Sequence, residues 1–123
     1  MDQQQVPLET RQVVLSATVP AATAQQIVDF SPLTGRITSV TFHFPPGCNA
    51  LVDVAFWKGG IQISPKQGFL ALDDATPTYP MSEPVRGWDR LWILIRNTDA
   101  VNQHTPSVIV TIEGHFKPLG KVA

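Results

Sequence analysis

The sequence predicts an all-β protein, an antiparallel β-sandwich of the jelly-roll kind with about eight strands. Three observations lead to this fold class. Short runs rich in Val, Ile, Thr and Phe alternate between apolar and polar residues, which is typical of half-buried strands. Eleven prolines and eight glycines interrupt these runs, and turn signals at spacings of roughly eight to twelve residues are typical of sandwiches and barrels. The length of 123 residues is the usual size of one domain.

Nine runs have strand character, which makes about eight or nine short strands. They are residues 12–19, 26–30, 36–44, 50–57, 61–64, 69–72, 78–85, 90–96 and 107–116.

The best-defined run in the first half of the chain is residues 36–44. Val40, Phe42 and Phe44 alternate with Ser, Thr and His, so that one face of the strand would be buried and the other exposed. Pro45 and the residues after it end the run, because proline cannot donate a hydrogen bond to a neighbouring strand.

A β-hairpin is predicted in the middle of the chain. Residues 50–57 alternate with apolar side chains on one face, and residues 61–64 would return beside them. Gly59 and Gly60 lie between the two runs, where glycine readily supplies the positive φ that a tight turn needs. Residues 69–72 are the next predicted strand.

The second half of the chain continues the pattern. Residues 78–85 contain two prolines, which favours an edge strand. Residues 86–89 are predicted to form a turn. Residues 90–96 carry Leu and Ile on one face, and residues 107–116 carry Val and Ile. Between these two strands, residues 97–106 are predicted to be a polar loop.

The predicted organisation is one domain with two short flanks. Residues 1–11 are expected to be a polar arm, residues 12–116 the sandwich, and residues 117–123 a tail. Cys48 is the only cysteine, so no intrachain disulfide can form.

Charge and hydropathy restrict the kinds of partner and location. The net charge of −1 gives no electrostatic basis for binding nucleic acid. No apolar stretch approaches the about 20 residues of a membrane helix, and no basic segment followed by an apolar run indicates a signal peptide. We therefore expect synthesis in the cytoplasm, with no nucleic-acid and no membrane partner.

The candidates for chemistry are few. His43, His115 and Glu113 would approach one another if their strands pair, and such groups suit zinc. Asp73 and Asp74 lie in a predicted loop, as calcium ligands often do, but a turn explains them more simply. No nucleophile, phosphate-loop or zinc-protease motif occurs. The sequence therefore predicts no enzyme, no cofactor and no metal site, and a metalloenzyme built on the histidines is the least favoured interpretation.

The outward-facing side chains are unusually apolar. Charged residues are only 15% of the chain, against about 25% in ordinary globular domains. A solvated sheet face normally carries polar residues, and large apolar patches usually mark an interface. We expect an oligomer interface or ligand face that includes Leu51, Trp57, Trp88, Trp92, Leu94 and Ile109. Carbohydrate binding is an alternative role for these tryptophans. An explanation without a partner is that the alternation slips at a bulge, or that loops or the arm cover these residues, and we favour the interface over it.

The chain resembles small β-sandwich proteins of virions, the phage capsid decoration or accessory class. The resemblance depends on residues 44–56 and 84–114, in which a Gly-Trp-Asp turn precedes a strand, an Asn-Thr-Asp loop and a Val/Ile-rich strand. It implies a non-enzymatic protein, made in the cytoplasm, that forms a homo-oligomer, often a trimer, and binds a capsid lattice.

Together these observations predict a structural or binding protein that oligomerises and docks onto a larger assembly, such as a virion. The alternative is a carbohydrate-binding or adhesion module.

Overall fold

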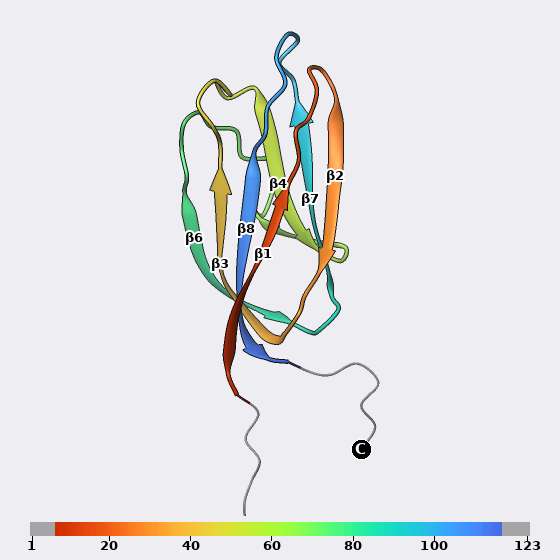
Figure 1. Cartoon of the computed structure of the whole chain (residues 1–123), viewed down its shortest axis with the longest axis vertical. Helices are drawn as coiled ribbons and strands as arrows, with labels where there is room; N and C mark the ends of the chain where they lie inside the picture. Colours follow the sequence, from red (N-terminus) through yellow and green to blue (C-terminus); the bar gives the residue numbers. More distant parts are fainter. Residues whose placement is uncertain (1–6, 117–123) are drawn as a thin grey trace, which may run out of the picture.

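The computed structural model describes residues 7–116, and most of the predicted arm and the whole predicted tail lie outside the described residues. The described residues form eight strands (Figure 1). The strands are β1 (Glu9–Ser16), β2 (Ala24–Phe30), β3 (Thr34–His43), β4 (Val52–Lys58), β5 (Ile61–Ser64), β6 (Thr78–Val85), β7 (Arg90–Asn97) and β8 (Ser107–His115). β1 thus includes Glu9 to Arg11, which the sequence assigned to the arm.

The strands form two four-stranded sheets in the orders β1-β8-β3-β6 and β2-β7-β4-β5. All neighbours within each sheet run antiparallel. Only β4 and β5 are joined by a hairpin within one sheet, and every other connection crosses between the sheets. This arrangement of eight strands in two sheets is that of a jelly roll. The predicted all-β sandwich is confirmed.

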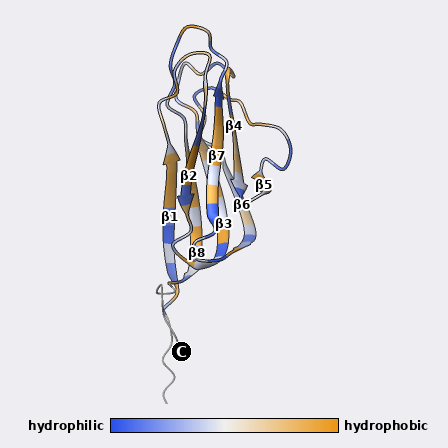
Figure 2. Cartoon of the chain, turned by 90° about the vertical axis from the view of Figure 1, so that its right-hand side faces the viewer, coloured by the Kyte–Doolittle hydropathy of each residue, from blue (hydrophilic) through white to orange (hydrophobic). Residues whose placement is uncertain are grey.

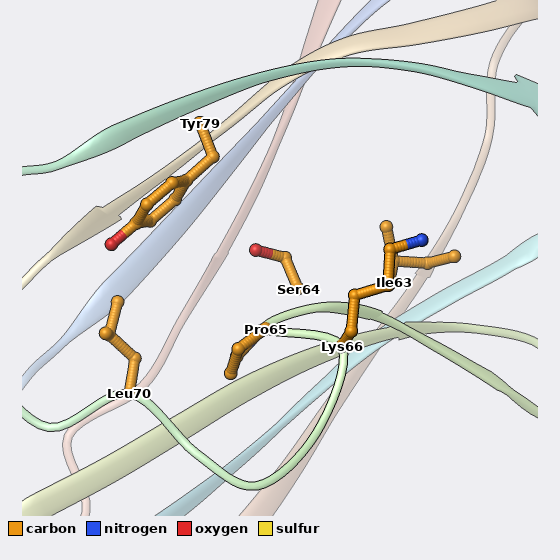
Figure 3. Close-up of a pocket in the computed structure, with 6 residues that line it drawn as sticks. All are labelled: Ile63, Ser64, Pro65, Lys66, Leu70 and Tyr79. Carbon is orange, nitrogen blue, oxygen red and sulfur yellow. The ribbon is translucent and has the colours of Figure 1, made fainter.

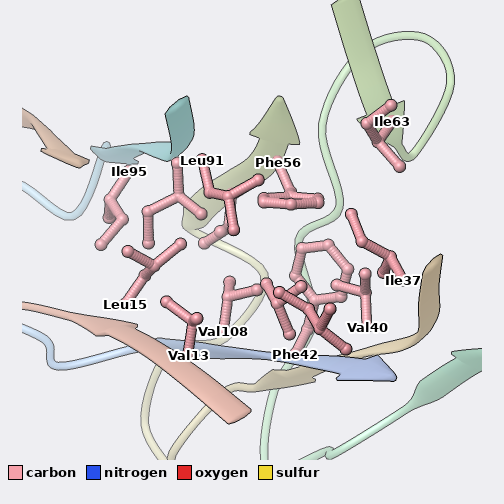
Figure 4. Close-up of a cluster of buried hydrophobic side chains, with 14 of the residues drawn as sticks. Val13, Leu15, Ile37, Val40, Phe42, Phe56, Ile63, Leu91, Ile95 and Val108 are labelled. Carbon is pink, nitrogen blue, oxygen red and sulfur yellow. The ribbon is translucent and has the colours of Figure 1, made fainter. Parts of the chain in front are cut away.

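The core lies between the two sheets and follows the predicted alternation. In β7, Leu91, Ile93 and Ile95 have no exposed surface, and in β8 the same holds for alternate residues from Val108. Phenylalanines contribute the largest buried side chains, and Figure 4 shows Phe42 from β3 among the buried aliphatic residues of both sheets. One contiguous apolar core therefore joins the sheets.

Several strand bounds differ from the predicted ones, and one predicted strand is not formed. β3 ends at His43, and Phe44 forms only an isolated bridge with Ala75. Residues 69–72 are not a strand, because Leu70 makes a single isolated bridge to Val54. The segment after β5 pairs with β4 only at Leu70 and then crosses to the other sheet, so no further residues of this segment pair with β4. The turn at Gly59 and Gly60 and the edge position of β6 agree with prediction.

Candidate functional site

The outer face of the β2-β7-β4-β5 sheet carries a pair of stacked tryptophans. Trp57 in β4 lies directly opposite Trp92 in β7. Their ring centroids are 4.4 Å apart and the ring planes differ by 6°. Trp92 Nε1 donates a hydrogen bond of 2.8 Å to the carbonyl oxygen of Gly59. Both rings are therefore fixed in orientation by the hairpin and the strand pairing.

Further apolar side chains extend this pair along the sheet. Phe69, in the loop after β5, packs edge-on against Trp57 with centroids 6.1 Å apart. Leu94 lies on the same side of β7 as Trp92, and Val28 of β2 is opposite Trp92. We call this surface the aromatic face, and it comprises Val28, Phe30, Trp57, Phe69, Trp92 and Leu94.

Arginines occupy the two ends of the aromatic face. The guanidinium of Arg90 lies 5.4 Å from the centroid of the Trp92 ring, and that of Arg96 lies 3.9 Å from the Phe69 ring. Arg96 Nη2 also forms a salt bridge of 2.9 Å with Asp53 Oδ2. Guanidinium groups pack favourably on aromatic faces, so the arginines cover ring surface while their charges stay near water.

The side chains of the aromatic face differ in exposure. Trp57, Trp92 and Leu94 are half-buried, and the two tryptophans cover one another. Val28 and Phe30 in the edge strand β2 retain 39% and 47% of their surface. This part of the face is the most accessible to a partner.

The sequence analysis missed Val28, Phe30 and Phe69. Val28 and Phe30 are two residues apart and therefore share one side of a strand, but residues 26–30 do not alternate between apolar and polar side chains, because Ile27 and Val28 are adjacent. No local signal brings Phe69 to Trp57.

The six residues predicted as one interface do not form a single surface. Trp57, Trp92 and Leu94 share the aromatic face, but Ile109 lies on the outer face of the other sheet, opposite Val14. The six residues are divided between surfaces because β7 and β8 belong to different sheets, and their role as an interface or ligand face stays a prediction.

Leu51 was predicted on the outer face of a strand, and it lies in a turn instead. Asn49 and Ala50 both adopt positive φ, and the Leu51 amide donates a hydrogen bond of 2.8 Å to the Cys48 carbonyl. β4 therefore begins after this turn, at Val52.

Trp88 lies in the predicted turn between β6 and β7 and is 58% exposed. Its φ of 74° is left-handed, which is unusual for a bulky residue. Two backbone hydrogen bonds stabilise the turn. The Asp89 amide donates to the Arg86 carbonyl at 3.0 Å, and the Trp88 amide donates to the Ser31 carbonyl at 2.8 Å. Trp88 thus lies beside the end of β2 but outside the stacked pair.

The outer face of the β1-β8-β3-β6 sheet has a different character. Its side chains are mostly polar, and several of its threonines form hydrogen bonds to neighbouring side chains. Thr41 and Thr78 hydroxyls are 2.8 Å apart, and Gln12 Nε2 donates to Thr111 Oγ1 at 3.3 Å. This is the composition expected of a solvated sheet face, with Val14 and Ile109 as a local apolar exception.

The histidines of the metalloenzyme interpretation lie far apart. β3 and β8 do pair, but His43 is opposite Ser107 while His115 is opposite Thr34, at the other end of the sheet. His43 instead bonds to Thr76 at 2.9 Å. Residues 7–116 contain no group of three His, Cys, Asp or Glu side chains placed to hold a metal.

Asp73 has a structural role in the described chain. Its carboxylate accepts hydrogen bonds from the amides of Gly47 at 2.9 Å and Asn49 at 3.0 Å. Cys48 between them is buried. Burial, and then the negative charges of Asp73 and Asp99, raise the pKa of its thiol, which disfavours the nucleophilic thiolate.

A buried polar network that the sequence analysis did not identify ties two loops together. His104 Nε2 lies 2.8 Å from Asp99 Oδ2, and a carboxylate only accepts, so the ring nitrogen donates. Asn97 donates to the carbonyls of Val19, Pro20 and Asn102. The hydrogen bond from His104, followed by those from the amides of Val101 and Asn102, holds the pKa of Asp99 well below its usual range.

One shallow cavity of about 250 Å³ lies beside β5 (Figure 3). It is bounded by Ile63, Ser64, Pro65, Lys66, Leu70 and Tyr79, and its walls are mostly apolar. It contains no cluster of converging polar groups that would orient a substrate. In the same described part of the chain, no helix is long and apolar enough to cross a membrane.

Comparison with known proteins supports the fold. No protein-family model and no curated protein sequence matches the chain. A solved structure of Bacillus endospore appendages, which form disulfide-linked pili, aligns with a TM-score of 0.53 and 19% identity over 95% of this chain and 96% of that one. The structure of FlhE aligns with a TM-score of 0.48 and 13% identity, over 85% and 96% of the two chains. A structure of infectious bursal disease virus, Gx strain, aligns with a TM-score of 0.31 and 14% identity, over 85% of this chain and 32% of that one. The likeness to the appendage subunit is a likeness of fold.

Proposed function

We propose that this chain is a non-enzymatic structural subunit that self-associates through its aromatic face and thereby builds a larger protein assembly. The observation that carries the proposal is the contrast between the two outer faces of the sandwich. One carries hydrogen-bonded threonines, and the other carries stacked tryptophans with exposed Val28 and Phe30 beside them. Arg90 and Arg96 lie at the ends of that face, where the polar rim of an interface belongs.

Burial of apolar surface favours a second copy of the chain as the partner that binds this face. Burying one large apolar side chain is worth about 1.5–3 kcal/mol, and Val28 and Phe30 together supply a comparable gain when a partner covers them. Aromatic residues and arginine are also enriched at interface cores. Because each subunit presents the same face, an isologous contact about a two-fold axis satisfies both copies at once.

Two observations support the kind of assembly that we propose. The chain shares its fold with a pilus subunit over nearly its full length, and its sequence resembles virion decoration proteins. We propose on these grounds that the assembly is a filament or a capsid-bound oligomer. Cys48 is the only cysteine and is buried, so the contacts in the proposed assembly are non-covalent.

Carbohydrate binding is the alternative, and the geometry of the tryptophans argues against it. A sugar ring stacks on a free indole face, whereas Trp57 and Trp92 oppose each other at 4.4 Å. Phe69 and Arg90 lie against the remaining ring surfaces. If a glycan binds saturably and changes tryptophan fluorescence at constant molecular mass, this alternative replaces our proposal.

The experiment that tests the proposal is solution mass by multi-angle light scattering over a range of concentrations. Leu94→Glu places a carboxylate at the centre of the aromatic face, and we expect a lower mass than the parent's because the charge would be desolvated in the contact. Thr111→Glu is the matched control, since Thr111 is half-buried on a central strand of the opposite sheet, and it should keep the parent mass. A parent protein that stays monomeric at all concentrations would overturn the proposal.

A further inference from the structure

Each sheet has two edge strands, and three of these four edges are poorly suited to pair with another chain. β6 contains Pro80 and Pro84, and proline removes a hydrogen-bond donor. β5 has only four residues and is followed by Pro65. β1 carries Glu9 and Arg11, which form an ion pair of 2.9 Å. Prolines, short strands and charged side chains are the usual devices that prevent edge-to-edge association.

The fourth edge, β2, lacks the prolines, the short length and the ion pair of the other three, and its one charged side chain, Asp29, accepts a hydrogen bond of 2.7 Å from the Phe30 amide. It has seven residues with neither proline nor a basic side chain, and Asp29 is its single charge. Six of its seven residues are exposed, and only Ile27 is partly buried against the core. β2 borders the molecule on the right of Figure 1, and Figure 2 views that side of the sandwich. An unprotected edge of this length is a template for strand addition.

We propose that β2 pairs with β2 of a second copy, antiparallel, about a two-fold axis at Ile27. This inference rests on the proposed function, since it supplies a second contact for the same self-assembling subunit. The axis at Ile27 uses all seven residues of the strand and places Ala24 opposite Phe30 of the other copy, Gln25 opposite Asp29, and Gln26 opposite Val28. The joined sheet then has eight strands.

The side chains in this register complement one another. The exposed Phe30 ring meets the small Ala24 on the outer face. The Asp29 carboxylate, whose Oδ1 accepts from the Phe30 amide of its own chain, offers Oδ2 to the amide donor of Gln25. No like charges are directly opposed, which would be unfavourable across a strand pair. Moving the axis to Asp29 would instead oppose two carboxylates. The strand is therefore self-complementary in the register that buries most of it.

The contact adds to the assembly rather than competing with the aromatic face. The side chains of the face stand out from the sheet, whereas pairing at β2 is made mainly by backbone groups in the plane of the sheet. Phe30 lies where the two contacts adjoin, since its ring belongs to the face and also meets Ala24 of the paired strand. Two different contacts on one subunit allow an assembly larger than a dimer, which one isologous contact alone does not. We infer that Leu94→Glu, which blocks the face, leaves a dimer held by β2.

The test measures the dissociation constant of the Leu94→Glu dimer by sedimentation velocity, with substitutions at the exposed Gln25. Gln25→Glu opposes like charges at two symmetry-related positions and should raise the Kd by about twofold to thirtyfold. Gln25→Lys opposes a cation to Asp29 and should lower the Kd by a similar factor, less so in high salt. Gln12→Glu, at an exposed position of β1, is the control and should leave the Kd unchanged.

The outcomes separate this inference from the proposed function. If Leu94→Glu is monomeric, or if both Gln25 variants keep its Kd, the β2 contact is refuted while association through the aromatic face stands. If the parent protein is a monomer, the proposed function fails, and the β2 contact fails with it. Opposite shifts of Kd for Gln25→Glu and Gln25→Lys support the contact.

Discussion

The stacked tryptophans give the most quantitative prediction, because each partner of the pair can be removed separately. We expect Trp92→Ala to lower the free energy of unfolding by about 2–4 kcal/mol. The variant loses the stack with Trp57, worth about 0.5–1.5 kcal/mol, and the hydrogen bond to Gly59, worth about 0.5–1.5 kcal/mol. The remainder comes from the half-buried apolar surface of the ring, at about 25 cal/mol per Å².

A double-mutant cycle isolates the stack from the other losses. The combination Trp57→Ala and Trp92→Ala should be less destabilising than the sum of the two single variants, with a coupling energy of about 0.5–1.5 kcal/mol. Urea unfolding followed by far-ultraviolet circular dichroism measures all four proteins without depending on tryptophan emission. Val14→Ala, at a 58% exposed position of the opposite outer face, is the control and should change stability by less than about 0.5 kcal/mol.

Two results would refute this reasoning. A coupling energy near zero would mean that the rings do not contact each other in solution. A Trp92→Ala variant as stable as the parent would mean that the outer face contributes nothing to the monomer, so that its apolar residues would serve association alone. Measurements at a protein concentration below the dissociation range keep the two contributions apart.

Three further predictions concern the backbone and the buried polar network. Gly114→Ala should lower the free energy of unfolding by about 1–3 kcal/mol or more, because a β-carbon there would collide with the Thr34 carbonyl. Gly60→Ala is the control, since a β-carbon there would meet open space, and it should leave the free energy of unfolding nearly unchanged in the same urea assay. Ala50→Gly should raise the melting temperature, with a gain of about 0.5–1 kcal/mol, because Ala50 has a φ of 58° that glycine adopts without strain; a loss of stability would contradict the turn geometry. The depressed pKa of Asp99 means that its ionised form stabilises the fold above the unfolded pKa of about 3.9. This stabilisation is lost as the pH falls from the unfolded-state pKa through the lower folded-state pKa. The urea midpoint of the parent should therefore decrease below about pH 4, and Asp99→Asn should make the midpoint less dependent on pH in this range.

Most strands and their buried faces could be predicted from the alternation of apolar and polar residues alone. Alternation is a local property: successive side chains of a strand point to opposite sides, so Leu91, Ile93 and Ile95 could be assigned to the core without knowledge of their neighbours. The same reasoning placed Trp92 and Leu94 on the outer side of that strand. Prolines in residues 78–85 identified an edge strand for an equally local reason.

Only the tertiary structure decided which of these faces meet. Trp92 and Ile109 both point outward, yet they lie on opposite sides of the molecule because β7 and β8 belong to different sheets. His43 and His115 are on paired strands, and the register separates them to opposite ends. The packing of Phe69 against Trp57 and of His104 against Asp99 depends on loops whose paths have no periodic signal. Pairing joins segments that are distant in sequence, so alternation within one strand carries no information about its neighbour.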